Sequence, residues 1–121
     1  MIRRIVEDYE AKLVPTDSAR AGAKARGKAE WERYSNDEEE LSVSVRNLDL
    51  PDGTELDAYL NGGFVGRLVL RGGYAKVKLE SKKGDGVPRA GEGSTMTVSL
   101  NGTEILRGQP AILLAGTFVR D

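Results

Sequence analysis

The fold is decided by residues 41–60, LSVSVRNLDLPDGTELDAYL. Apolar side chains occupy every second position on both sides of Pro51-Asp52-Gly53, and this period of two is typical of strands with one buried face. The Pro-Asp-Gly sequence supplies a fixed φ, a side-chain cap and a residue that tolerates positive φ, so it predicts a turn. The stretch therefore predicts two strands that are joined by a turn.

The same alternation extends toward the C-terminus through residues 64–70, 75–80 and 95–100. Turns are predicted at Asn61-Gly62-Gly63, at Gly72-Gly73 and at Asn101-Gly102, which leads into Ile105-Leu106. Residues 81–94, rich in glycine and charge, predict a long crossover. Residues 112–119 are apolar on both faces, which favours a central or covered strand.

The N-terminal part of the sequence is compatible with two structures. Residues 1–14 fit either a helix or a strand, and the strand is favoured because strands dominate the rest of the chain. Residues 19–31 alternate small and charged side chains, which predicts a strand that ends near Trp31 and Tyr34. Residues 1–22 could thus be a strand arm and linker that pairs within its own chain or with a neighbouring sheet edge.

These segments amount to eight or nine strands in a single domain of residues 1–121. The expected fold class is all-β, a two-sheet antiparallel sandwich or a small barrel. The apolar members of the alternation should be buried: Leu41, Val43, Val45, Leu56, Leu60, Leu68, Leu70, Val77, Leu79, Met96, Val98 and Leu100.

The chain of 121 residues contains neither His nor Cys. It therefore lacks the usual general base at neutral pH, the thiolate nucleophile and the preferred ligands of zinc and copper. Without a serine-hydrolase motif either, the sequence favours a function other than catalysis. No hydrophobic signal region opens the chain, and the longest apolar run, Ala111–Ala115, is too short to span a bilayer. We expect a cytosolic protein or the mature part of an exported one, without membrane insertion.

One acidic turn is a candidate calcium site, and calcium is the only cofactor that the sequence leaves open. Calcium prefers six to eight oxygen ligands, and several carboxylates are close together in this turn. The alternative is an ordinary Pro-Asp-Gly turn with solvated neighbours. The candidate ligands are Asp49, Asp52, Glu55 and Asp57.

Charge is distributed unevenly along the chain, whose net charge is −1. Residues 35–60 hold eight acids and one base, whereas residues 61–92 hold seven bases and three acids. A contact between two such patches would be heterologous and would build a filament or layer. The alternative is a mixed surface that keeps the protein soluble. The candidate interface residues are Glu38, Glu39, Glu40, Lys76, Lys78, Lys82 and Lys83.

A second basic group, Arg20, Lys24, Arg26 and Lys28, is followed by Trp31 and Tyr34. Basic residues with adjacent aromatics can bind nucleic acid. Because the net charge is negative and acidic residues follow, a solvated strand face is the favoured interpretation, and no nucleic-acid partner is expected.

Several motifs from Leu41 onward carry a resemblance: LSVSV, PDG, NGGFVGRLVL, GVP and the closing GTEILRG. In these motifs the chain resembles small bacterial β-sandwich domains, many of them in exported proteins, which implies an extracellular or cell-surface location. Its hairpin spacing is also similar to the sandwich of Cu/Zn superoxide dismutases, but every histidine ligand is missing, so dismutase activity is not implied.

The sequence thus predicts a non-enzymatic structural or interaction module that pairs with copies of itself or with a protein partner. A module that binds calcium or carbohydrate through loops at one end is the alternative.

Overall fold

The computed structural model describes residues 3–16, 18–106 and 109–120, which fold into eight strands. A helical turn, α1 (Ser18–Ala21), precedes the second strand, and a 3-10 turn, η1 (Ser81–Lys83), follows the sixth. The strands are β1 (Ile5–Pro15), β2 (Arg26–Tyr34), β3 (Glu39–Arg46), β4 (Glu55–Leu60), β5 (Gly63–Val69), β6 (Ala75–Glu80), β7 (Thr95–Leu106) and β8 (Gln109–Arg120). The all-β prediction is confirmed.

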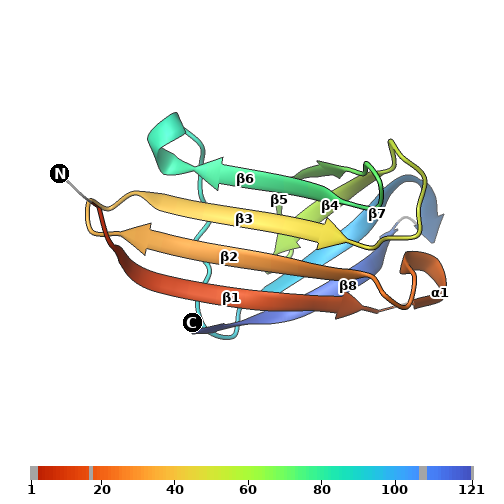
Figure 1. The fold of residues 1–121 in the computed structure, drawn as a ribbon, viewed down its shortest axis with the longest axis horizontal. Helices are drawn as coiled ribbons and strands as arrows, with labels where there is room; N and C mark the ends of the chain where they lie inside the picture. The colour runs from red at the N-terminus through yellow and green to blue at the C-terminus, as the bar shows by residue number, and fades with distance from the viewer. Residues whose placement is uncertain (1–2, 17, 107–108, 121) are drawn as a thin grey trace.

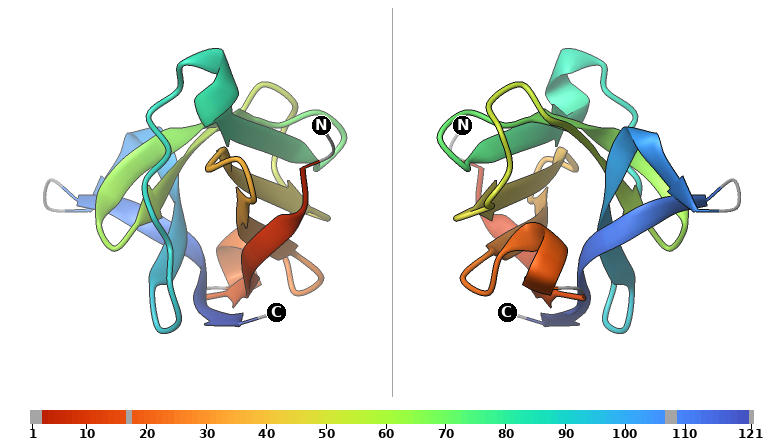
Figure 2. Two further views of the ribbon diagram at one scale, coloured as in Figure 1. Left: turned by 90° about the vertical axis from the view of Figure 1, so that its left-hand side faces the viewer. Right: turned by 90° about the vertical axis from the view of Figure 1, so that its right-hand side faces the viewer.

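All eight strands belong to one antiparallel sheet in the order β5-β4-β7-β8-β1-β2-β3-β6. β1, β2, β3 and β6 form one side of the molecule, and the other four strands lie behind them (Figure 1). The sheet curls until its two edge strands approach each other, as the views along the strands show (Figure 2). A Cβ on Gly66 of β5 would lie 3.0 Å from Val77 Cγ2 of β6.

The result is a nearly closed barrel, which was the second of the two expected architectures. The two-sheet sandwich does not describe it, because β1 and β8 pair from Tyr9↔Arg120 to Pro15↔Leu114 and so join the two halves of the sheet. The prediction that residues 112–119 form a central strand is confirmed, since β8 lies between β7 and β1.

The barrel interior is filled by apolar side chains. Nine of the twelve residues expected in the core are buried, whereas Val77, Leu79 and Leu100 pack against the core and remain partly accessible. The largest fully buried side chains are Trp31 and Phe118, and alanines at positions 11, 25 and 29 are also fully covered. Small residues on β1 and β2 thus accompany two large aromatic side chains in one narrow interior.

Two local predictions were wrong. Residues 19–25 do not extend β2, because α1 and a turn occupy this segment and the strand begins only at Arg26. The chain also does not turn at Asn101-Gly102: β7 continues to Leu106 and pairs with β8 through Leu106↔Gln109. The pairing is irregular at this point, because Leu100 pairs with Ala111 and Ile105 with Pro110, so the register shifts between them before the ladder resumes.

The N-terminal segment forms a strand, as favoured from the sequence. In the described structure β1 pairs with β2 on one side and with β8 on the other, both in its own chain, which is the first of the two pairings expected for this segment. In the described part of the chain, no helix is both long enough and apolar enough to cross a membrane.

The crossover between β6 and β7 passes over one end of the barrel (Figure 2, left). Ala90 is buried there, and the Arg89 guanidinium lies 5.2 Å from the centroid of the Trp31 ring. Arg89 Nη2 also donates a 3.0 Å hydrogen bond to Glu7 Oε2, while Arg33 Nε donates one of 2.8 Å to Glu7 Oε1. The bond from Arg33 holds the pKa of Glu7 below its usual value. At this end of the barrel, ion pairs of Glu7 with Arg33 and Arg89 therefore link β1 to β2 and to the crossover.

Candidate functional site

The outer face of β1, β2, β3 and β6 arranges its charges in rows that cross the strands. Because strand residues alternate, the odd-numbered positions of β1, β2 and β3 turn inward and the even-numbered ones turn outward. The pairing then places outward residues side by side. The acidic row is Asp8, Glu32, Glu40 and Glu80, and the middle row is Glu10, Glu30, Ser42 and Lys78.

Two further rows on the same face are basic. They lie at the end of the strands nearer to α1, and we call them together the basic end. The lysine row is Lys12, Lys28, Ser44 and Lys76, and the arginine row contains the pair Arg26 and Arg46. From one end of this face to the other, the charge therefore changes from negative to positive.

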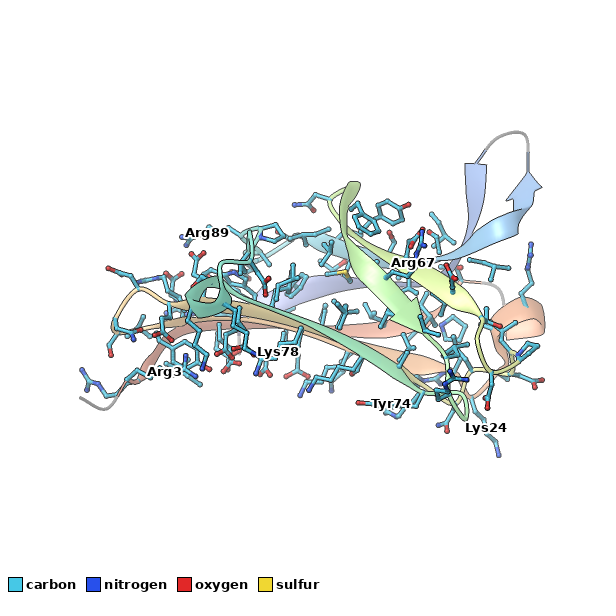
Figure 3. All side chains as sticks on the ribbon, turned by 90° about the horizontal axis from the view of Figure 1, so that it is seen from above. Arg3, Lys24, Arg67, Tyr74, Lys78 and Arg89 are labelled. Carbon is cyan, nitrogen blue, oxygen red and sulfur yellow. The ribbon has the colours of Figure 1, made fainter. Side chains whose placement is uncertain are left out.

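Cations of the same chain neutralise much of the acidic row. Arg3 Nη2 lies 3.0 Å from Glu40 Oε2, and Lys78 Nζ lies 3.3 Å from Glu40 Oε1. Glu80 is within 3.7 Å of the ammonium groups of Lys78, Lys82 and Lys83. The guanidinium carbon of Arg3 also lies 3.8 Å from the centroid of the Tyr34 ring. Figure 3 shows Arg3 and Lys78 on this side of the sheet.

The pKa values reflect this crowding. Burial opposes ionisation of Glu40, but hydrogen bonds from Arg3 and Lys78 outweigh it and lower the pKa. Burial raises the pKa of Tyr34 to about 12, with help from the charges of Glu32 and Glu40. Burial likewise raises the pKa of Glu32, and the neighbouring Glu30 and Asp8 add to the effect. Cations thus pair with Glu40 and Glu80 at one side of the acidic row, whereas neighbouring like charges oppose the ionisation of Glu32 at the other side.

Asp8, Glu30 and Glu32 offer carboxylate oxygens within 4.8 Å of one another. With one ligand oxygen each, these three carboxylates supply fewer oxygens than the six to eight that calcium prefers, and they reach six only if each binds through both of its oxygens. This group is the one carboxylate cluster of metal-binding geometry in the part of the chain with described coordinates, and none of the four predicted calcium ligands belongs to it.

The basic end has far less internal neutralisation. Within the described residues, Lys12, Arg46 and Lys76 form no ion pair, and Lys28 has only Glu10, at 3.9 Å. Arg26 Nη1 donates to the carbonyls of Ala23 and Ala25 at 3.2 and 2.7 Å, which turns its guanidinium toward the loop. A depression of about 400 Å³ lies here and is lined by Lys12, Arg26, Lys28, Arg46, Glu10 and the adjoining Leu13, Val14 and Gly27.

The predicted calcium ligands have other partners. Arg67 lies 2.9 Å from Glu55 and 3.1 Å from Asp57, across β4 and β5. Asp52 Oδ1 accepts a 2.8 Å hydrogen bond from the amide of Gly72. The backbone amide of Asp49 donates to the carbonyl of Ala21 at 3.0 Å. Calcium binding at these residues stays a prediction, and it would have to compete with Arg67 for two of the four carboxylates.

The predicted interface residues lie next to each other in one molecule. Glu38 pairs with Arg3 at 2.6 Å, the Glu39 amide donates to Ser81 Oγ, and Glu40 pairs with Lys78. The expectation of two separate patches was wrong in this respect, since pairing of β3 with β6 joins the acidic segment to the basic one. The actual separation of charge runs along the strands.

The basic group expected near two aromatics is also divided. Trp31 points into the interior and is fully buried, so it is no surface stacking platform. Arg26 and Lys28 belong to the charged face, whereas Arg20 lies in α1 and Lys24 in the following turn. Lys12 and Arg46 were not singled out from the sequence, because only the strand register brings them beside Lys28 and Arg26.

Comparisons of the chain with protein families, with curated proteins and with solved structures found no match. The resemblance to β-sandwich domains of exported proteins therefore rests on the sequence motifs alone.

Proposed function

We propose that this chain is a non-enzymatic interaction module that binds an anionic partner at its basic end. The observation that carries the proposal is the unequal neutralisation of the two ends of the charged face. Among the described residues, Glu40 and Glu80 of the acidic row pair with Arg3, Lys78, Lys82 and Lys83, whereas the basic end pairs with a single carboxylate, Glu10.

Unpaired cations that converge on a depression create a local positive potential, which raises the concentration of anions there and their rate of association. The partner's negative groups would supply the counter-charges that the described residues of the chain do not. Because these lysines and arginines are exposed, the attraction is screened over roughly 8–10 Å at physiological salt and should weaken as salt rises.

The proposal is tested by NMR titration with tripolyphosphate, a small flexible polyanion. We expect amide shifts at Lys12, Lys28 and Arg46 and their neighbours, and little change at the acidic row. Reversal of Lys12 and Arg46 to Glu should abolish these shifts. The matched control, Lys82→Glu with Lys83→Glu, carries the same charge change at the other end and should retain them. Absence of shifts at the basic end of the wild-type protein would refute the proposal.

Self-association is the second candidate function, and one observation favours it. The acidic cluster of Asp8, Glu30 and Glu32 lies on the same face as the basic end, so two antiparallel copies would bring opposite charges together. Pairing between sheet edges has less support, because β5 and β6 approach one another within the barrel. Sedimentation at low and high salt distinguishes the candidates: a monomer at both leaves only the external anionic partner.

A further inference from the structure

The order of the rows restricts how an anionic chain can lie on the charged face. Along β2 the outward residues change from Arg26 and Lys28 to Glu30 and Glu32. Outward residues of one strand are separated by about 7 Å. An anionic chain that followed β2 would therefore meet two cations and then two carboxylates, whereas one that crosses the strands stays over the basic end.

The crossing direction also sets the spacing of the cations. Neighbouring strands lie about 5 Å apart, so Lys12 and Lys28 are one such step from each other and Lys76 is two steps beyond Lys28. Ser44 stands between them and offers a hydroxyl. A polysaccharide with one carboxylate on each sugar ring repeats its charge once per ring, which is comparable to the spacing of the strands.

Tyr74 lies two residues before Lys76, the last member of the lysine row. It immediately precedes β6, is 51% exposed and lies on the same side of the sheet as Lys24 (Figure 3). A tyrosine has a flat apolar ring and a polar hydroxyl, so it can cover the face of a sugar ring while its hydroxyl remains hydrated. Single-stranded nucleic acid is usually held by several stacked aromatics. Among the described residues, Tyr74 is the one exposed aromatic beside the basic end.

From these three observations we infer that the partner is a linear acidic polysaccharide that lies across β1, β2, β3 and β6 at the basic end. This inference rests on the proposed function and adds the class and the direction of the ligand. Lys12, Lys28 and Lys76 pair with the carboxylates of the first, second and fourth sugar rings along the row, Ser44 faces the third ring, and the acidic row prevents the polymer from lying along the strands.

The experiment is a calorimetric titration of the full chain with galacturonate oligomers of two, four and six residues. The lysine row spans three strand spacings, about 15 Å. We therefore expect the tetramer to bind at least tenfold more tightly than the dimer and the hexamer to add little. Lys12→Gln with Lys76→Gln should weaken binding of the hexamer at least tenfold, and Lys82→Gln with Lys83→Gln should change it less than twofold. All four lysines are exposed, and thermal unfolding confirms that the variants are folded.

The failures of the two proposals are distinguishable. If tripolyphosphate binds at the basic end but oligomer length has no effect, or if both lysine pairs matter equally, the polysaccharide inference is overturned and anion binding survives. A single-stranded oligonucleotide of equal charge that binds more tightly than the hexamer would also overturn it, by changing the class of the partner. If neither tripolyphosphate nor galacturonate binds, both proposals fail.

Discussion

Gly116 of β8 lies against the backbone carbonyl oxygen of Lys12 in β1, so closely that a Cβ on Gly116 would overlap this oxygen. Leu13 Cδ2 is also only 2.8 Å from the position that the Cβ would take. A backbone atom in a paired strand cannot move away as a flexible side-chain end can. The two halves of the sheet therefore meet closely at these two residues.

Gly116→Ala should lower the free energy of unfolding by at least about 2 kcal/mol, because the added methyl group forces the β1–β8 pair apart. Urea unfolding monitored by circular dichroism measures the change. Gly86→Ala is the control, since no atom lies within 4 Å of a Cβ there and the change should stay within about 0.5 kcal/mol. Equal stability of the two variants would contradict the tight contact.

Val43→Asp should cost several kcal/mol, because it places an unpaired charge in the barrel interior. The adjacent substitution Ser44→Asp adds the same charge on the outer face, between Lys28 and Lys76, and should be nearly neutral. Thermal unfolding of both variants tests the assignment of the two faces of β3. A larger loss for Ser44→Asp would mean that the register of β3 is wrong.

How much the sequence could predict depends on whether a feature is local. Alternation within a strand is local, so the buried face of β3 and the turn at Asn61-Gly62 were predictable; Asn61 and Gly62 do adopt positive φ, 50° and 85°. Which strands become neighbours is not local. The β1–β8 pair that makes the sheet a barrel joins segments about a hundred residues apart, and the alternation of residues within each strand does not predict this pairing.

The candidate site was missed for the same reason. Charges summed along the chain placed Glu40 and Lys78 in opposite patches, although they are neighbours across β3 and β6. The change of sign within one strand, from Arg26 and Lys28 to Glu30 and Glu32, was visible in the sequence. Its meaning requires the register, which aligns the cations of several strands into one basic end.

Glu32→Gln should stabilise the protein at neutral pH. Burial, together with Glu30 and Asp8, raises the pKa of Glu32 in the folded state above its ordinary value of 4.5. A raised folded pKa means that ionisation opposes folding: the wild-type protein loses stability as pH rises from about 4.5 through the folded pKa. Melting temperatures of the variant and the wild type should thus converge below about pH 4. A difference that is independent of pH would contradict this cause.

Arg67→Ala should lower the free energy of unfolding by about 1–3 kcal/mol, because it leaves the buried Asp57 carboxylate without its ion pair. The double variant Arg67→Ala with Asp57→Asn should recover part of the loss, since the charge is then gone as well. Chemical denaturation of both checks the coupling. If the double variant loses more free energy of unfolding than the two single variants lose together, the stability contributed by Asp57 does not depend on Arg67.

Arg89→Gln should alter the fluorescence of Trp31, which is the only tryptophan of the chain and lies under the Arg89 guanidinium. The stability loss should stay below about 1 kcal/mol, because Arg89 is 61% exposed in its pair with Glu7. Lys83→Gln lies on the same crossover, away from Trp31, and should leave the emission spectrum unchanged. Identical spectra for all three proteins would show that Arg89 does not cover the indole.

The adjacency of β1 and β8 also determines when the chain can finish folding during its synthesis. Of the eight strands, β1 is made before the other seven and finds its second partner in β8, which is made after them. Until then, β1 has only β2 as a paired neighbour and the two halves of the sheet are not joined along this side, so part of the apolar interior stays open to other nascent chains. Any truncation that removes β8 should accordingly expose the nascent chain to aggregation or degradation, however intact the preceding strands are.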